Sequence, residues 1–558
     1  MEGNAHTDRE NGTQFREKCF EMWRKFRYFA YAFRIKPGCT AIMKRTIITC
    51  IAALLLLSAQ AQAPGPGRHG WDSYVGRHSS VNSKEYIHIR TRVPGELHKR
   101  LTAEDRKRVV RISVSGPINT ADLRILADLA NRSRIVGRDG KDREAWLDLD
   151  LEMARLTEYG RVATQLPDGT FSNCRTLRSV LLPSNTEVVS SRLFSYCSHL
   201  EMVGMPEGVY SIGERAFYSC GEMYEFYMPN SVEEIGNSAF GSCSHLEQVR
   251  MPSRLRHIGY GAFESTRLSR VDLPNGLQSI GDRAFALTNL REVTLPSSLV
   301  EMGANAFNNA GFSAFRVAAG NSQFSEYDGM LFSRDGAELI RVPVGRRGNL
   351  TISNRVNYIG PSAMSGCSYL TSVYLPDDIT EVSVGMFYGC SDLTDVRLSP
   401  YTQSIGADAF HSCTSLRTID LPDGITRIGE AAFRNCKKLV TIKLPADLRY
   451  IEDHAFHYCT SLTEVNMPYS LVSIGTEAFD NCDALRIVSL PASVKSIGKK
   501  AFYNCNQLIM IRSRATMPPA TDKICDNVKR VVLSIPPGTA SRYKAASGWD
   551  KFKSVREE

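Results

Sequence analysis

A strict period of 23 residues constrains the fold of this chain more than any other feature. The stretch IGADAFHSCTSLRTIDLP at 405–422 returns 23 residues later as IGEAAFRNCKKLVTIKLP. Its Ile, Gly, Ala, Phe, Cys, Leu and Pro positions hold while most other residues change. A repeat this strict predicts a solenoid, in which each unit packs only against its neighbours. The Phe position marks fourteen units, at Phe171, Phe194, Phe217, Phe240, Phe263, Phe285, Phe307, Met364, Phe387, Phe410, Phe433, Phe456, Phe479 and Phe502.

Each unit ends in a short segment of alternating apolar and polar residues. In SLRTIDLP, Leu416, Ile419 and Leu421 are the apolar positions. Thr418 and Asp420 alternate with them, which predicts a short strand with one face outward and a Pro at its end. The Gly of IGxxAF allows a sharp turn, and only a turn or a short helical segment fits before the Cys. We therefore predict a right-handed coil with one parallel β-strand per unit of 22 or 23 residues.

The unit IGxxAFxxCxxLxxVxLP resembles the BspA-like, treponemal-type leucine-rich repeat of bacterial surface antigens. The resemblance spans residues 171 to 512, and its departures are small: Glu452 replaces the Gly, Met302 the Ile and Met364 the Phe. It implies a leucine-rich-repeat-like solenoid. It also implies a cell-surface or secreted protein that adheres to host matrix or to other bacteria.

The segments around the repeats predict a domain order. Two Asp–Gly pairs where the period breaks predict a β-hairpin-like island, and the open ends of a solenoid need caps. The resemblance extends to the C-terminal cap, since relatives often end in a similar YxxAxGWxxF segment. The expected segments are 1–42 as a wrongly assigned N-terminal extension, 43–63 as a signal peptide, 64–87 as a flexible lead, 88–165 as an α/β cap, 166–312 as repeat block 1, 313–356 as the island, 357–512 as repeat block 2, and 513–558 as the C-terminal cap.

Residues 43–63, MKRTIITCIAALLLLSAQAQA, have the basic start, apolar core and small-residue end of a secretory signal. The apolar run is too short for a permanent span, so we expect no integral membrane span in the mature chain. A cytoplasmic tail on an uncleaved anchor is the alternative interpretation of residues 1–42. We expect export to the cell surface or the medium of a Gram-negative bacterium, with the periplasm as the alternative.

The charge of the chain excludes a nucleic-acid-binding surface. Residues 1–63 hold ten Lys and Arg against five Asp and Glu, so the formal charge of +9 falls to +4 for residues 64–558. The basic residues alternate with acidic ones and form no continuous basic stripe, which phosphate backbones require.

The cysteines follow the repeat. Eleven lie three residues after the marker, and Cys525 lies near the expected C-terminal cap. Disulfides between neighbouring coils are open as an alternative, because stacked coils place equivalent positions about 5 Å apart. Two observations favour buried free thiols instead. The number of repeated cysteines is odd, and the Cys is missing from three units, those of Phe263, Phe285 and Phe307. The eleven are Cys174, Cys197, Cys220, Cys243, Cys367, Cys390, Cys413, Cys436, Cys459, Cys482 and Cys505.

Enzyme motifs are absent from the sequence. His454, His457 and Cys459 come nearest to a ligand cluster, but both His occupy variable positions and are interpreted as exposed turn residues. No His column accompanies the Cys column, and the sequence has no GxSxG, phosphate loop, HExxH or CxxC. We therefore expect no enzyme activity, no cofactor and no metal.

The outward position before the last apolar residue of each strand mixes Tyr and Arg, which interfaces favour. A solvated face is the alternative. We predict an exported, non-enzymatic repeat protein that binds a protein or glycan through this column. A hydrolase or inhibitor with its site at a cap or the island, and a structural envelope component, are the other hypotheses, and the oligomeric state stays open. The predicted binding residues are Tyr227, Arg250, Tyr374, Arg397, Asp420 and Lys443.

Overall fold

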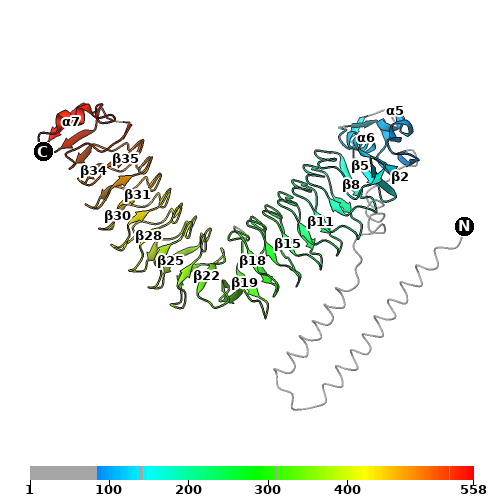
Figure 1. Cartoon of the computed structure of the whole chain (residues 1–558), viewed down its shortest axis with the longest axis horizontal. Helices are drawn as coiled ribbons and strands as arrows, with labels where there is room; N and C mark the ends of the chain where they lie inside the picture. Colours follow the sequence, from blue (N-terminus) through cyan, green and yellow to red (C-terminus); the bar gives the residue numbers. More distant parts are fainter. Residues whose placement is uncertain (1–84, 133, 137–141, 145, 309–310, 527) are drawn as a thin grey trace, which may run out of the picture. The chain divides into compact units, whose positions relative to one another are not determined.

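The computed structural model describes residues 85–558, apart from 133, 137–141, 145, 309–310 and 527. Over the repeats the chain forms a parallel β-solenoid, which confirms the predicted coil (Figure 1). The expected N-terminal extension and signal peptide lie outside the described residues, as do residues 64–84 of the expected lead. None of the helices in the described ranges has the length and apolar character that crossing a bilayer requires.

Most regular coils contribute short strands that pair in parallel with the equivalent strands of neighbouring coils, and these strands form several separate sheets. The strands that follow the marker have three to five residues and alternate exposed and buried side chains, as predicted. They are β12 (Glu225–Tyr227), β14 (Gln248–Arg250), β17 (Glu292–Leu295), β19 (Ala314–Val317), β23 (Gly348–Thr351), β25 (Leu370–Tyr374), β27 (Asp395–Arg397), β30 (Thr441–Lys443), β32 (Glu464–Asn466), β34 (Ile487–Leu490) and β36 (Met510–Ser513).

In most units a second strand of only two residues precedes the Gly position, which is occupied in three units by Ser190, Ser383 and Glu452. The sequence did not predict it, because two residues are too few for alternation to show. These strands form two six-stranded ladders. The first contains β9 (Val188–Val189), β11 (Ser211–Ile212), β13 (Glu234–Ile235), β15 (His257–Ile258), β16 (Ser279–Ile280) and β18 (Glu301–Met302). The second contains β26 (Glu381–Val382), β28 (Ser404–Ile405), β29 (Arg427–Ile428), β31 (Tyr450–Ile451), β33 (Ser473–Ile474) and β35 (Ser496–Ile497).

The N-terminal region is an α/β unit whose sheet continues into the first coils. The side chain of Asn119 caps α6 by accepting hydrogen bonds from the amides of Ala121 and Asp122. Buried Asp148 accepts two hydrogen bonds from Arg178, which ties the sheet to the first coil. The elements are β1 (Tyr86–Arg90), α4 (Leu97–Arg100), α5 (Ala103–Arg108), β2 (Arg111–Ile118), α6 (Thr120–Ala130), β3 (Arg134–Val136), β4 (Asp142–Glu144), β5 (Leu147–Asp150), β6 (Ala154–Glu158), β7 (Arg161–Val162), β8 (Leu177–Leu181) and β10 (Met202–Gly204).

Two antiparallel connections interrupt the coils between the two blocks of repeats. Asp328 and Gly329 form the turn between β20 (Phe324–Tyr327) and β21 (Met330–Ser333), both with positive φ. Asp335 and Gly336 lie in the next turn, before β22 (Glu338–Arg341). Parallel pairing of β22 with β24 (Tyr358–Ile359) then returns the chain to the coil.

The C-terminal end is covered by an aromatic cluster. The last parallel strands, β37 (Val532–Ile535) and β38 (Ser554–Glu557), extend the sheet of β36 and flank α7 (Ala540–Ala545). The Tyr543 hydroxyl donates a hydrogen bond to the Ala515 carbonyl, and the Trp549 indole donates one to the Pro519 carbonyl. Both side chains are buried, so the last coil exposes no open apolar interior there.

The core is a stack of equivalent side chains. Consecutive marker Phe rings stack with centroids 5.0–5.7 Å apart, for example Phe433 on Phe456 at 5.2 Å. The Gly column permits this close spacing. A Cβ on Gly429 would lie 2.7 Å from the Ala407 nitrogen, a distance that real side chains do not tolerate.

The repeated cysteines are free and buried, which confirms the interpretation as packing residues. The structure adds a hydrogen bond: in nine coils the thiol donates to the carbonyl of the residue 26 positions earlier, at 2.9–3.2 Å. In the shortened coils Thr266 and Thr288 occupy the Cys position and donate to the carbonyl of their own Phe. The Cys position of the repeat, whether Cys or Thr, therefore supplies a buried hydrogen-bond donor at the bend of these coils.

The thiols should be unreactive in the folded chain. Burial raises the pKa of Cys436 to about 12, and only the thiolate is a strong nucleophile. Titration of the full chain with a chromogenic disulfide reagent should detect at most the three cysteines outside the described residues, and all 15 after denaturation. A denatured count near three would reveal disulfides and contradict the structure.

Two positions of each regular coil have the left-handed conformation. Ser219 has φ of 60°, and Gly389 occupies the same coil position with φ of 72°. A non-Gly residue in the left-handed conformation lowers the free energy of unfolding by about 1–2 kcal/mol. Part of this cost is offset because a non-Gly residue loses less backbone entropy on folding than Gly does. Ser219→Gly should therefore raise the free energy of unfolding by about 0.5–1 kcal/mol.

The reciprocal variant provides the control. A Cβ at Gly389 would make only ordinary contacts, so Gly389→Ser should lower stability through φ alone. Denaturant midpoints measured by circular dichroism check both variants. Shifts of the same sign would show that side-chain packing, rather than backbone conformation, decides stability at this position.

Candidate functional site

The six predicted binding residues lie at matched strand positions in three pairs. Tyr227 pairs with Arg250 across β12 and β14, and Tyr374 pairs with Arg397 across β25 and β27. The third pair, Asp420 and Lys443, is joined by an isolated β-bridge, since residues 416–419 form no strand. All six are exposed except Tyr374, which is half-buried.

A shallow groove surrounds the first pair. Its volume is about 420 Å³, and it extends from β12 over β14 to the segment at 269–272. That segment forms no strand in the structure, although its unit carries the alternating pattern. The interruption falls at a unit of 22 residues, where one residue is missing between the Cys position and the Leu. The hollow therefore arises at the break in the regular ladder.

The groove is lined by charged and aromatic groups. The Tyr227 hydroxyl donates a hydrogen bond to Glu225 at 2.9 Å, and burial together with that carboxylate raises the pKa of Tyr227. Arg270 donates to Asp272 at 3.0 Å at the far side. A hydrogen bond to Glu247 also raises the pKa of the neighbouring Tyr224. Aromatic faces beside carboxylates and guanidinium groups suit sugar hydroxyls or polar peptide segments.

Sequence analysis missed the other residues of this groove. Glu225 and Gln248 occupy the other outward position of the strand, two residues before Tyr227 and Arg250. The alternation in the sequence marks both positions as outward, so the signal was available. The hollow itself was not predicted, because the alternating pattern at 269–272 indicates a strand that the folded chain does not form there.

A second groove of about 520 Å³ lies over the ladder of β11, β13, β15, β16 and β18. The glycines of successive units form its floor, and polar side chains such as His257 and Tyr260 border it. Four of its lining residues are glycines, which contribute only main chain to the surface. None of the six predicted binding residues lies in this groove.

The interpretation of the two histidines as exposed is wrong for His457. Its exposed fraction is 8%, because the equivalent position of the next coil, Asp480, covers it. Burial, with the positive charge of Arg434 and the neighbouring His454, lowers the pKa of His457 to about 4. The ring is therefore neutral at pH 7. His454 is half-buried in the same turn.

Comparison with known proteins identifies one family. A family model described as a BspA type leucine rich repeat region matches in six copies, within residues 164–333 and 347–509. Comparison with curated proteins gives no match.

Solved structures resemble the solenoid. One is a leucine-rich repeat protein from Eubacterium ventriosum, 24% identical, with a TM-score of 0.53 over 55% of this chain and 84% of that protein. A leucine-rich cell surface protein from Faecalibacterium prausnitzii is 22% identical, with a TM-score of 0.43 over 69% of this chain and 91% of that one. A Bacteroides ovatus leucine-rich repeat protein is 25% identical, with a TM-score of 0.34 over 65% and 86%. The first likeness shows the fold.

Proposed function

We propose that this protein is exported and binds another macromolecule through the outward face of its strands. The basis is that the chain belongs to the BspA-type leucine-rich repeat family. Its ligand is a protein or a glycan on host matrix or on other bacteria. The role is adhesion or recognition at the cell surface, without catalysis.

The observation that carries the proposal is the pairing of Tyr227 with Arg250 beside a groove of about 420 Å³. A solvated face needs neither aromatic side chains nor a hollow. Tyr227 is 37% exposed and Tyr224 49% exposed, so two large aromatic surfaces face solvent within four residues. Tyr and Arg contribute most of the binding energy in many interfaces, because they bury large areas at low entropic cost.

The second Tyr–Arg pair extends the binding face into the other repeat block. Tyr374 and Arg397 repeat the arrangement of Tyr227 and Arg250, and the Arg397 guanidinium lies 4.0 Å from the Asp377 carboxylate. Within each pair, the parallel pairing of neighbouring strands fixes the separation of the Tyr and the Arg. A ligand with repeating units, such as a fibrous matrix protein or a polysaccharide, could then contact more than one pair and gain avidity.

Removal of the four side chains should abolish most of the binding. Tyr227, Arg250, Tyr374 and Arg397 changed together to Ala should lower the affinity for the ligand at least 10-fold, as expected when hot-spot residues are lost. The measurement is binding of the full chain to arrays of extracellular-matrix proteins, glycans and whole bacteria. Circular dichroism should stay unchanged, since Tyr227, Arg250 and Arg397 are exposed and Tyr374 is only half-buried.

Small polar residues of the same column supply a matched control. Thr294, Asn466 and Ser489 changed together to Ala should leave binding within about 2-fold, because truncating such side chains costs little. Equal affinity of wild type and the Tyr–Arg variant would remove the strand face from the binding role. Equal loss in both variants would indicate contact with the main chain or shape alone.

A further inference from the structure

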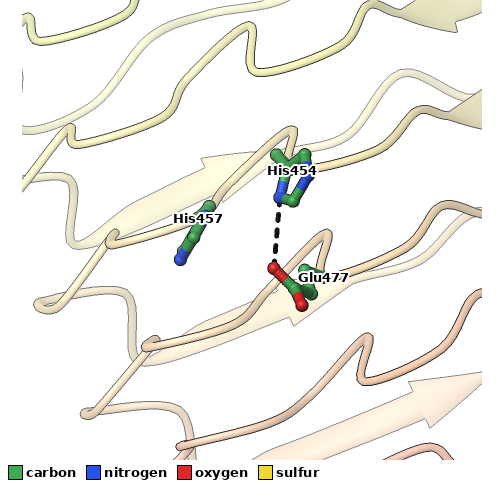
Figure 2. A group of neighbouring side chains, drawn as sticks. All are labelled: His454, His457 and Glu477. Carbon is green, nitrogen blue, oxygen red and sulfur yellow. Dashed lines mark ion pairs between the residues drawn. The ribbon is translucent and has the colours of Figure 1, made fainter.

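A group of polar side chains at one edge of the second repeat block has no part in the strand face. His454 and His457 lie on one turn, and Glu477 and Asp480 occupy the same two positions of the next coil. The 23-residue period therefore stacks His454 with Glu477 and His457 with Asp480. Figure 2 shows Glu477 approaching His454 from the neighbouring coil, with His457 beside them.

The imidazole nitrogens of this cluster are incompletely satisfied. Nδ1 of His457 and Nδ1 of His454 are both buried and have no hydrogen-bond partner. Leaving a polar atom buried and unpaired destabilises the folded state. His457 is more than nine-tenths buried, so water does not freely compensate this atom. A buried Nδ1 atom without a hydrogen bond indicates that a ligand or an ion binds there.

The other nitrogen of His457 is accounted for. Its Nε2 lies 3.3 Å from the Asp480 carboxylate and 3.5 Å from the Asn481 side-chain amide nitrogen, and the shorter contact, to an acceptor, favours a proton on Nε2. Asp480 is itself held by a hydrogen bond from Asn504 at 3.1 Å. This arrangement favours the tautomer in which Nδ1 carries the lone pair. Carboxylate–histidine pairs of this kind orient the imidazole ligands of metal ions.

The donor atoms are close enough to share an ion. One ligand atom each from His454, His457 and Glu477 lies within 4.8 Å of the other two. Ligands in a tetrahedral zinc site are about 3.3 Å apart, given bond lengths near 2.0–2.1 Å. The two imidazole rings are stacked, with centroids 5.4 Å apart and planes 24° apart, so at least one ring must turn to direct both lone pairs at one ion. The side chains of His454 and Glu477 are 28% and 23% exposed, so an ion can enter from solvent.

We propose that His454, His457 and Glu477 bind a Zn²⁺ ion that connects two neighbouring coils, with water in the fourth position. Two imidazoles and one carboxylate form a donor set that zinc accepts readily. Nδ1 of His457, which has no hydrogen bond, and Nδ1 of His454, which faces Glu477 at 3.5 Å, then become ligands. The site is independent of the strand-face proposal and adds a metal-dependent link within the solenoid.

The surrounding charges determine how strongly the ion is held. Glu477 offers Oε2 toward His454 at 3.5 Å, while its Oε1 accepts from the Lys500 ammonium at 3.2 Å. Arg434, in the preceding coil, acts as a positive charge on His457, and Asp480 adds a second carboxylate. The two cations limit the affinity without blocking the Oε2 side of Glu477. We expect a site that binds zinc measurably and releases it to a chelator.

A matched pair of residues elsewhere in the solenoid serves as the control. Asp408 and His411 occupy the same two coil positions as His454 and His457, two coils earlier. There the His411 ring nitrogen Nδ1 already contacts the Asp408 carboxylate at 2.7 Å. With its Nδ1 satisfied and no second His beside it, His411 should contribute nothing to zinc binding.

The test is a zinc titration of the full chain without a histidine tag, stripped with a chelator and measured against a competing chromophoric chelator. Wild type should bind one Zn²⁺ more than the His454→Ala/His457→Ala variant, and His411→Ala should match wild type. Glu477→Gln, which keeps the side-chain shape, should weaken that site at least 10-fold. This variant keeps the test valid if the double variant folds poorly.

Two further measurements separate coordination from general stabilisation. Zinc should raise the melting temperature of wild type and His411→Ala but not of the double variant, because it binds only the folded site. Co²⁺ should give the visible absorption bands of a four-coordinate site with wild type alone. Equal zinc stoichiometry and affinity in wild type and the Glu477→Gln and double variants would overturn the proposal, as would no zinc binding by wild type.

Discussion

Hydrogen bonds between the main chains of neighbouring coils are the interaction on which the rest of this structure depends. Phe433 donates its amide to the Ala455 carbonyl at 2.7 Å, and Gly429 donates to the Ile405 carbonyl at 2.8 Å. These bonds hold coils close enough for the marker Phe rings to stack. No single coil could bury its Phe or satisfy its main chain alone, so the stability of each unit comes from its neighbours.

The same spacing decides where chemistry can arise. Residues one period apart become neighbours, so a site needs suitable residues at one coil position in successive units. Tyr227 and Arg250 meet this condition on the strand face, and His454 and Glu477 meet it at the turn. The side chains at the constant positions of the repeat already pack or hydrogen-bond within the solenoid. The thiol of Cys436, for example, donates to the Phe410 carbonyl. Functional groups are thus confined to the positions that the repeat leaves variable.

Sequence reasoning predicted the features that repeat. The solenoid and the outward direction of Tyr374 and Arg397 follow from periodicity and alternation, because both patterns report directly which face of the chain is buried. It did not predict the groove beside Arg250 or the burial of His457. Both depend on neighbouring coils: the groove on the segment 269–272, which forms no strand, and the burial of His457 on Asp480 of the next coil.

The repeat pattern alone predicts the coil, the residues of its core and the two outward columns, because each unit has apolar and polar residues at the same positions. Tertiary structure decided which variable residues become partners and which atoms remain unsatisfied. Nothing within one unit distinguishes His454 and His457 from ordinary turn residues. The stacking of coils brings Glu477 and Asp480 against these histidines and buries an imidazole nitrogen without a hydrogen-bond partner. Contacts between coils are set by the register of main-chain pairing, which the sequence within one unit does not specify.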